Sequence, residues 1–372
     1  IAVRTADLSE DMAKFNANGA VELLHDNVKK FETTATGVTI SGGSSTGANL
    51  TITSTATDDN IAPDLILYRN SSSPADNDNL GGLEWQGNHS GSGINSYAQI
   101  TCMAEDVTDG TEDASLRFYT ATGGSTSEKM RINSSGAVGI GETPNVWNNV
   151  YKALQLGRTA SIAGYTGGDI DRVWVTANGY VNTSDGNWQY INTDTASQHE
   201  QRDGKHNFFV APSGTSGATI SWTTAMTIAN GGQVTMPLQP SFNAYHNGSS
   251  YNSGTSVSSL DLDTVRVNVG SHYDITTAPY RFTAPVAGVY KFNYRTIVNG
   301  AVNSAHVRMH KNGAQLAGSD NHYTATVNSQ WSFFTTSCLT TLAANDYVQV
   351  LHTSTCAIHG GDYQSFNGYL IG

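Results

Sequence analysis

The chain has 372 residues, 38% apolar and only 13% charged, so it is long enough for two or three domains and is not a charge-rich disordered protein. Its net charge of −12 at pH 7 argues against nucleic acid as a partner, because an acidic surface repels phosphate groups. No apolar stretch approaches the roughly 18 residues that a membrane-spanning segment needs, so we expect no membrane insertion.

Turn-forming residues dominate the composition. Glycine is frequent and proline rare, 38 residues against 8, and short apolar runs alternate with clusters of serine, threonine and asparagine. This pattern predicts an all-β protein with many tight turns. The best helical candidate, residues 9–14, is barely two turns long and runs into an Asn-Ala-Asn-Gly turn signal. Because the first residue is Ile1 rather than Met, we expect the chain to be a piece of a longer or processed product.

One pattern recurs three times, and each copy predicts a β-hairpin. An apolar residue precedes a glycine by four positions, and two apolar residues follow the glycine at alternate positions. The copies are centred on Gly19 (Phe15, Val21, Leu23), Gly136 (Ile132, Val138, Ile140) and Gly232 (Ile228, Val234, Met236), and a methionine stands just upstream of each (Met12, Met130, Met226). Such alternation is typical of half-buried strands, and we expect the glycine to supply the positive φ of the turn. We call these three segments hairpin joints.

The joints divide the first two thirds of the chain. Residues 30–42 predict one more hairpin, so we expect 1–42 to form an N-terminal hairpin segment of a shaft. Residues 43–145 and 146–239 then form two β modules, each ending in a hairpin joint. Within the first module, alternate apolar residues predict one shared buried face: Leu83, Trp85, Ala98, Ile100, Cys102, Leu116 and Phe118.

Both modules are predicted to be antiparallel meanders. The predicted strands of the first module are residues 64–70, 81–87, 96–104 and 114–120, and those of the second are 152–157, 171–176, 186–191 and 206–211. A hairpin with one apolar face is marginal in water, and each joint is too small to bury its own apolar residues. Three copies around a common axis would bury these faces against one another, so we expect a homotrimer.

The ordered set of segments in these modules resembles a known class of viral proteins. The runs PDLILYRNSSSPADNDNLGGLEWQG, TDGTEDASLRFYT, EKMRINSSGAVGIG and ISWTTAMTIANGGQV resemble the modular shaft of tail fibres and other fibre proteins of tailed phages, marine ones in particular. The resemblance extends over roughly two thirds of the chain, from Ser9 to Met236. It implies a parallel homotrimer of short strands and a place on the surface of a virion.

Composition changes near residue 239. Six of the 19 basic and six of the 31 acidic residues lie from Pro240 onward, so the first 239 residues carry the whole net charge. Ten of the 17 tyrosines and seven of the 11 histidines also lie in this last third. Pro237 and Pro240 flank the change, which predicts a domain boundary and a separate domain over 240–372.

The last third resembles the globular domain of complement C1q and its tumour-necrosis-factor relatives. The segments that carry this resemblance are PSFNA (240–244), RFTAPVAGVYKFNY (281–294), VRMHKNG (307–313), LTTLAANDYVQV (339–350) and SFNGYLIG (365–372). The resemblance implies a ten-stranded jelly-roll sandwich that assembles as a trimer. Gly288, Tyr290 and Phe292 match the strand after the A-G-x-Y turn, and Phe366 and Gly368 match the C-terminal strand. Because the loops depart from the family pattern, the resemblance transfers no ligand residue.

Catalytic and metal sites are not indicated by the sequence. The acidic run 106–113 lacks the spacing of a calcium loop and is expected to be a solvated hairpin tip. His306 and His310 fall on one side of a predicted strand and are expected to be surface residues, with a metal site on a trimer axis as the alternative. No nucleophile elbow or catalytic triad is present, so we predict that the chain is not an enzyme and binds no cofactor.

The three cysteines do not form a disulfide framework or a zinc motif. We expect Cys102, Cys338 and Cys356 to be small buried apolar residues. A bridge between Cys338 and Cys356 on neighbouring strands is the alternative.

These observations predict a trimeric virion fibre that presents its C-terminal head for attachment to a glycan or protein on a host surface. Tyr323, Trp331 and Tyr363, which lie among polar residues, are the predicted receptor-binding residues, whereas Tyr290 is assigned to the core. We expect the N-terminal end, or the segment missing before it, to bind other virion proteins. The alternatives are a purely structural neck, capsid or baseplate fibre, with the head as a trimerisation clamp, and a glycan-degrading tailspike.

Overall fold

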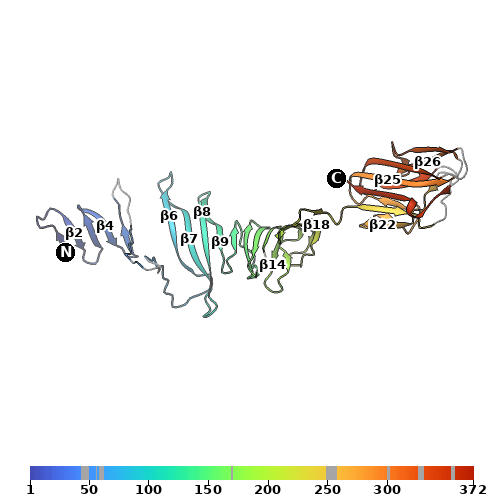
Figure 1. Ribbon diagram of the computed structural model, residues 1–372. Coiled ribbons are helices and arrows are strands. Elements are labelled where there is room, and N and C mark those ends of the chain that lie inside the picture. The colour runs from blue at the N-terminus through green and yellow to red at the C-terminus, as the bar shows by residue number, and fades with distance from the viewer. Residues whose placement is uncertain are drawn as a thin grey trace. The chain divides into compact units, whose positions relative to one another are not determined.

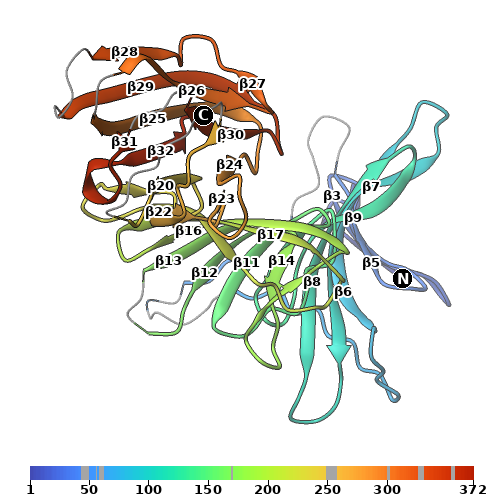
Figure 2. The same ribbon diagram turned by 90° about the vertical axis from the view of Figure 1, so that its right-hand side faces the viewer.

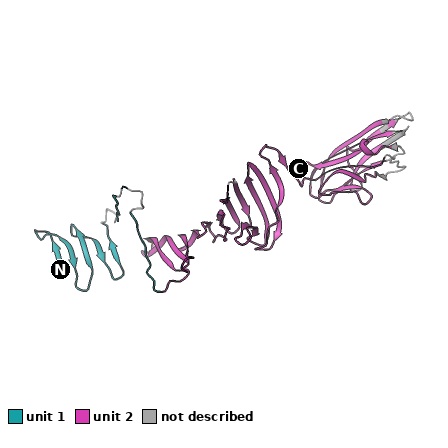
Figure 3. Cartoon of the chain, turned by 60° about the horizontal axis from the view of Figure 1, so that its bottom comes forward, with its two compact units in different colours: residues 1–72 teal, residues 73–372 magenta. Residues whose placement is uncertain are grey.

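The computed structural model confirms the all-β fold class. It describes residues 1–42, 50–55, 57, 63–168, 171–248, 258–299, 302–325, 331–352 and 357–372. In these ranges the one helical element is the short 3₁₀ turn η1 (Gly361–Tyr363), and no helix is long and apolar enough to cross a membrane. The chain separates into two compact units, residues 1–72 and 73–372 (Figure 3).

The first unit is an antiparallel meander of five strands. Its strands pair in chain order: β1 (Ala2–Arg4), β2 (Asp11–Phe15), β3 (Val21–His25), β4 (Val28–Thr33) and β5 (Val38–Ile40). The β4–β5 pair is the additional hairpin expected over residues 30–42. Asp26 and Asn27, the two residues between β3 and β4, both have positive φ, as a type I′ hairpin turn requires.

All three hairpin joints form, and they share one register. Phe15 pairs with Val21, Ile132 with Val138 and Ile228 with Val234. Gly136 and Gly232 have φ of 80° and 83° and so supply the left-handed conformation of their turns. In the first joint the prediction was wrong: Asn18, with φ 53°, takes that conformation in place of Gly19. Asparagine tolerates this region better than other residues with a side chain.

The second unit begins with one continuous sheet of twelve strands, coloured cyan to yellow-green in Figure 1. In spatial order its strands are β6 (Asn79–Asn88), β7 (Ile94–Asp106), β8 (Asp113–Thr122), β9 (Ser125–Ile132), β10 (Val138–Ile140), β11 (Tyr151–Leu156), β12 (Ala160–Tyr165), β13 (Arg172–Ala177), β16 (Asp194–Arg202), β17 (Lys205–Gly214), β18 (Thr223–Ile228) and β19 (Val234–Thr235). A separate hairpin, β14 (Gly179–Val181) with β15 (Trp188–Tyr190), interrupts the chain order between β13 and β16.

Three details of the predicted meanders were wrong. Residues 64–70 form no strand, and Leu65, Ile66, Leu67 and Tyr68 are exposed there, because no neighbouring segment pairs with them in the described part of the chain. Strands β10 and β11 run parallel, and the connection over residues 141–150 carries the chain back to the same end of the sheet. Residues 186–191 contain β15, which pairs with β14 in the separate hairpin and not with the predicted meander. The other predicted strands form and overlap β6, β7, β8, β11, β13 and β17.

The two faces of this sheet differ in composition. Cross-strand partners lie on the same face, so the register identifies a continuous row of side chains from β7 to β18. Its members are Cys102, Leu116, Ile132, Val138, Leu154, Ile162, Val175, His199, Phe208 and Met226. A second row on this face includes Leu83, Ile100, Phe118, Met130, Ile140 and Leu156. We call this the apolar face.

The apolar face is open to solvent in the single chain. Leu83, Leu116, Ile162 and Val175 are 40–50% exposed, and the predicted shared face of the first module is therefore correct in its membership but not covered. The opposite face carries polar groups, among them Arg117, which pairs with Glu105 at 3.3 Å. In a stable antiparallel sheet the apolar face is normally packed against a core and the polar face meets water.

The polar face is covered where the sheet passes β11 to β17. Trp147, from the connection between β10 and β11, and Trp188, the first residue of β15, pack with Trp174 of β13. The Trp147 and Trp174 rings each lie within 6.0 Å of the Trp188 ring. Trp147 and Trp174 are buried. The β14–β15 hairpin and the β10–β11 connection thus form a small core on the polar face of the sheet.

Residues beyond 239 form two facing sheets (Figure 2). One contains β22 (Thr264–Val269), β20 (Ser241–Tyr245), β32 (Ser365–Leu370), β25 (Gly288–Asn299), β29 (Trp331–Leu342) and β31 (Ala357–Ile358). The other contains β23 (Tyr273–Asp274), β24 (Arg281–Thr283), β30 (Tyr347–His352), β26 (Val302–Lys311), β27 (Ala314–Gln315), β28 (Asn321–Ala325) and β21 (Ser258–Ser259). Aromatic residues dominate the core between them, including Phe242, Tyr273, Phe282, Tyr290, Phe292 and Phe366.

Candidate functional site

Four of the five residues predicted as fold motif are buried in the C-terminal domain, and the fifth, Gly288, is half-buried at the start of β25. Tyr290, Phe292 and Phe366 are fully buried. The Tyr290 hydroxyl donates to the Val286 carbonyl at 2.8 Å, and burial raises the pKa of this phenol. A Cβ at Gly368 would lie 2.5 Å from the Phe292 ring and 2.8 Å from the Phe242 ring, so only glycine fits there.

Replacing Gly368 by alanine should destabilise the domain by about 1–3 kcal/mol, because both neighbouring rings are locked in the core and cannot give way. Denaturant unfolding measures the change. Gly372→Ala is the matched control, since a Cβ at Gly372 meets no atom within 4 Å. A Gly368→Ala variant as stable as the control would show that the β32 backbone packs less closely on these rings.

Of the three predicted receptor-binding residues, the side chain of Tyr363 is the one that the structure describes. Tyr323 lies on β28, paired with Ala305, and Trp331 begins β29, paired with Asn299, so these two residues belong to different sheets. Their side chains lie outside the described part of the chain. Tyr363 ends the η1 turn and is 53% exposed.

Tyr363 borders an aromatic pocket. Its ring meets that of His359 edge to face at 4.7 Å, and Ile297 and Phe333 complete the lining of a pocket of about 300 Å³. Phe333 is 82% exposed, whereas the next residue, Phe334, is buried. Phe333 was not predicted as a site residue. Its signal in the sequence is the Phe-Phe pair, because neighbouring residues of a strand face opposite sides and one of the two rings must point away from the core.

Ionic contacts hold the turn that carries Tyr363. Arg266 donates to the Asp362 carboxylate at 3.1 Å and to the Gly361 carbonyl at 3.2 Å, and its guanidinium lies 3.7 Å from the centre of the Tyr245 ring. Arg295 donates to the Asp362 carbonyl at 3.4 Å. These arginines fix η1 from two strands, so Tyr363 is presented on an ordered support.

The solvent-facing side of the β20–β25–β29–β32 sheet is polar at its centre. Asn293 donates to Asn367 at 3.1 Å, and Ser365 donates to Asn243 at 3.0 Å and accepts from Asn367 at 3.2 Å. Exposed apolar residues flank this row: Leu339 and Tyr369 on one side and Phe333 on the other. The sheet therefore offers a mixed surface with hydrogen-bonding groups and separate apolar anchors.

His306 and His310 lie on the outward side of β26, and the buried residues Val307 and Met309 alternate with this outward side. The Asp320 carboxylate contacts His306 and Arg308, each at 3.1 Å, and the pKa of this carboxyl is lowered by those two groups against the opposing effect of burial. His310 contacts the Gly313 carbonyl at 2.9 Å, away from that cluster. Throughout the described residues, no three His, Cys, Asp or Glu side chains are placed to hold a metal ion.

The acidic loop and the cysteines have local roles. Asp106 ends β7, and its carboxylate accepts from the Thr108 amide at 2.8 Å and the Thr111 hydroxyl at 3.3 Å, contacts that lower its pKa. Cys338 is a free, buried thiol with its sulfur 3.3 Å from that of Met309, and burial raises its pKa to about 11. Cys102 is free and half-buried, and Cys356 lies outside the described residues.

Comparison with known proteins bears on this domain. Residues 241–371 match the family model of the C1q domain. The C-terminal domain is C1q-like. Domains of the C1q and TNF type often form homotrimers and are typically not enzymes. No curated protein matches the chain.

Three solved structures are similar to the C1q-like domain, each over 36% of this chain. The globular domain of zebrafish complement 1qA is 19% identical, with 98% of its own chain covered and a TM-score of 0.29. The Eiger TNF of S. frugiperda is 11% identical, with 93% covered and a TM-score of 0.32. Murine APRIL is 9% identical, with 98% covered and a TM-score of 0.29.

Proposed function

We propose that the chain is a homotrimeric fibre protein of a phage virion whose C1q-like domain attaches the particle to a host surface. The main support for a homotrimer is the exposed apolar face of the twelve-stranded sheet. A face of this size, lined by Leu, Ile, Val and Phe over neighbouring strands, marks an interaction surface. Its occupants in the proposal are two further copies of the same chain.

The C1q-like domain supports the same symmetry, since domains of this type often assemble as homotrimers. A cyclic trimer would bring three copies of the apolar face to one axis and bury residues that are 40–50% exposed in the single chain. The resemblance of the first two thirds to phage fibre shafts supports a place on the virion surface.

The aromatic pocket beside Tyr363 supports an attachment role for the domain. Tyrosine and phenylalanine provide large contact areas at low cost in side-chain entropy, and the polar residues nearby supply hydrogen bonds. Three such pockets on one trimer would turn a modest affinity at each into lasting attachment through effective concentration.

The alternative is a structural fibre in which the domain only clamps the trimer. The exposed residues Leu339, Tyr369 and Phe333 on one sheet face favour this role, because they would serve as anchors between subunits.

Competition for adsorption separates the two functions. The purified full-length chain should reduce adsorption of the particle to susceptible cells, and Tyr363→Ala should reduce this competition while leaving the oligomeric mass unchanged. Tyr97→Ala, at an exposed tyrosine of β7, is the control. A trimeric wild-type chain that neither binds cells nor competes would contradict the attachment role and favour the clamp.

A further inference from the structure

Three cationic side chains lie directly opposite one another at one margin of the twelve-stranded sheet. Arg172 of β13 pairs with Arg202 of β16, and Arg202 pairs with Lys205 of β17. Cross-strand neighbours of like charge repel each other, so this register costs stability. It is also conspicuous in its surroundings, since the first 239 residues carry the whole net charge of −12.

The carboxylates near this row neutralise it only partly. Glu200 lies 4.0 Å from Arg172 Nε, but its oxygens already accept from Trp174 Nε1 at 3.2 Å and from Asn207 at 3.0 Å. Among the residues that the structure describes, Arg172 Nε is buried and has no hydrogen-bond partner. Such a buried donor costs free energy until an acceptor reaches the guanidinium.

The other two cations are more exposed. Arg202 pairs with Asp203 at 3.1 Å, in a contact where both side chains are about half exposed. Lys205 forms no ion pair with any residue in the ranges that the structure describes. In the described ranges, one guanidinium donor therefore lacks a hydrogen-bond partner and one ammonium group lacks an ion-pair partner.

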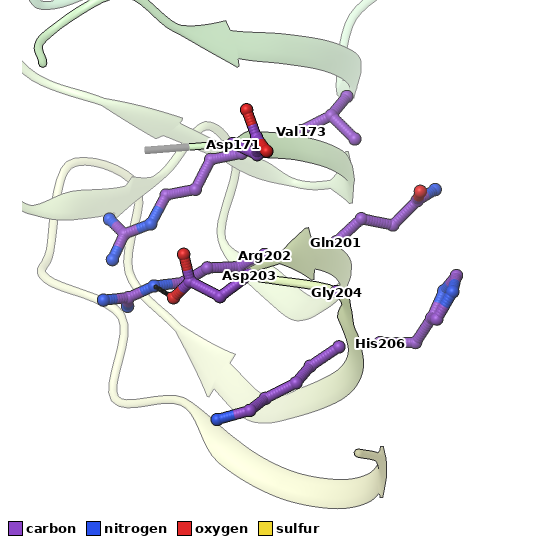
Figure 4. Close-up of a pocket in the computed structure, with 9 residues that line it drawn as sticks. Asp171, Val173, Gln201, Arg202, Asp203, Gly204 and His206 are labelled. Carbon is purple, nitrogen blue, oxygen red and sulfur yellow. Dashed lines mark hydrogen bonds and ion pairs between the residues drawn. The ribbon is translucent and has the colours of Figure 1, made fainter. Parts of the chain in front are cut away.

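A pocket of about 390 Å³ opens at this row (Figure 4). In Figure 4, Arg202 and Asp203 extend to one side of the strands, and Val173, Gln201 and His206 to the other, as strand alternation requires. Asp203 and Gly204 form a two-residue turn with φ of 51° and 71°, the conformation of a type I′ hairpin. The Asp203 amide also donates to the Asp171 carbonyl at 3.4 Å. This hydrogen bond connects the β16–β17 turn to the residue before β13 at the edge of the pocket.

We propose that this pocket binds an anionic sugar. Its phosphate or carboxylate group would contact the row of Arg172, Arg202 and Lys205, because arginine binds such groups through two parallel hydrogen bonds and lysine adds a point charge. The rim carboxylates of Asp171 and Asp203 would accept hydrogen bonds from sugar hydroxyls. This site belongs to the shaft and is separate from the attachment site proposed for the C1q-like domain.

Calorimetric titration of the full-length chain with inorganic phosphate, glucuronate and glucose, at pH 7 and constant ionic strength, tests the proposal. Glucuronate, phosphate or both should bind, and glucose should not. Binding of glucuronate would identify a carboxylate as the preferred acidic group of the ligand, and binding of phosphate would identify a phosphate group. Arg202→Gln and Lys205→Gln should each weaken binding by about tenfold, the effect of one charge-assisted hydrogen bond. Lys129→Gln, at a lysine of β9 that donates to Ser127, is the control and should bind as the wild type does.

Thermal melting distinguishes this site from a merely structural role of the lysine. In chloride alone, Lys205→Gln should melt at the same temperature as the wild type or higher, because the substitution removes repulsion. With the bound anion present, the wild type should gain more melting temperature than the variant. The proposal is overturned if neither acid binds, if glucose binds as well as glucuronate, if both variants bind like the wild type, or if Lys205→Gln melts lower in chloride.

Discussion

Replacing Ile132 by aspartate is expected to abolish trimer assembly. Ile132 lies in the central row of the apolar face, paired with Leu116 and Val138. In a trimer closed on this face, three unpaired carboxylates would be buried at one level, each at a cost of at least about 3 kcal/mol. Light scattering and thermal melting should show dissociation, and Val138→Asp should act in the same way.

The size of the destabilisation by Ile132→Asp shows whether the apolar face is covered by other subunits or open to solvent. In the single chain the Ile132 side chain is 36% exposed, so an aspartate there would be solvated and cost little. Thr235→Asp, at an exposed position of β19 next to Val234, adds the same charge away from the apolar face and should leave the assembly intact. If Ile132→Asp melts as Thr235→Asp does, the apolar face is not the subunit interface.

Lowering the pH from 6.5 to 4 is expected to remove about 3 kcal/mol of stability from the C1q-like domain through one residue. His352, at the end of β30, is 1% exposed, and burial lowers its pKa from 6.5 to about 4 because the charged imidazolium is disfavoured there. Above pH 6.5 the residue is neutral in both states and its contribution is fully present. Between pH 6.5 and pH 4 His352 takes up a proton in the unfolded chain but not in the folded one. The stability of the folded state therefore decreases as the pH is lowered.

A variant that cannot titrate isolates this contribution. His352→Gln should flatten the pH dependence of the unfolding free energy by about one proton between pH 6.5 and 4, measured by denaturant titration. Asp346 affects stability in a separate pH range. Its contacts with Lys311 and Asn312 lower its pKa to about 2, so its stabilising effect is lost only below pH 3.8. An unchanged slope in His352→Gln would contradict the buried neutral imidazole.

Local patterns predicted many of the strands that have one apolar side, although not β12. The hairpin joints and the strands with alternating apolar residues could be placed because the period of two is present in the sequence itself. Strand β16 (Asp194–Arg202) could not, because it is polar on both sides: Gln198 and Glu200 face the tryptophans, and His199 and Gln201 face the open side. Residues 64–70 show the opposite error, since an apolar run has no strand to pair with.

The candidate sites divide in the same way. Tyr363 was predicted from its polar neighbours, but the pocket beside it depends on Phe333 and Ile297, which the β25–β29 register brings together from distant positions. The row of Arg172, Arg202 and Lys205 is partly visible in the sequence, as the Arg-Asp-Gly-Lys turn at 202–205. Its third member, Arg172, joins it only through the pairing of β13 with β16. Register between strands is a property of the whole sheet, so it could not be derived from a single segment.

The mass of the full-length chain in dilute solution tests the central claim most directly, because the proposal covers the apolar face with two further copies of the chain and C1q-like domains often form homotrimers. Size-exclusion chromatography with light scattering should give about three times the chain mass of 39.5 kDa, unchanged on dilution to the lowest measurable concentration. A stable, folded species at 39.5 kDa would show that the apolar face remains open in solution and would contradict the trimeric fibre.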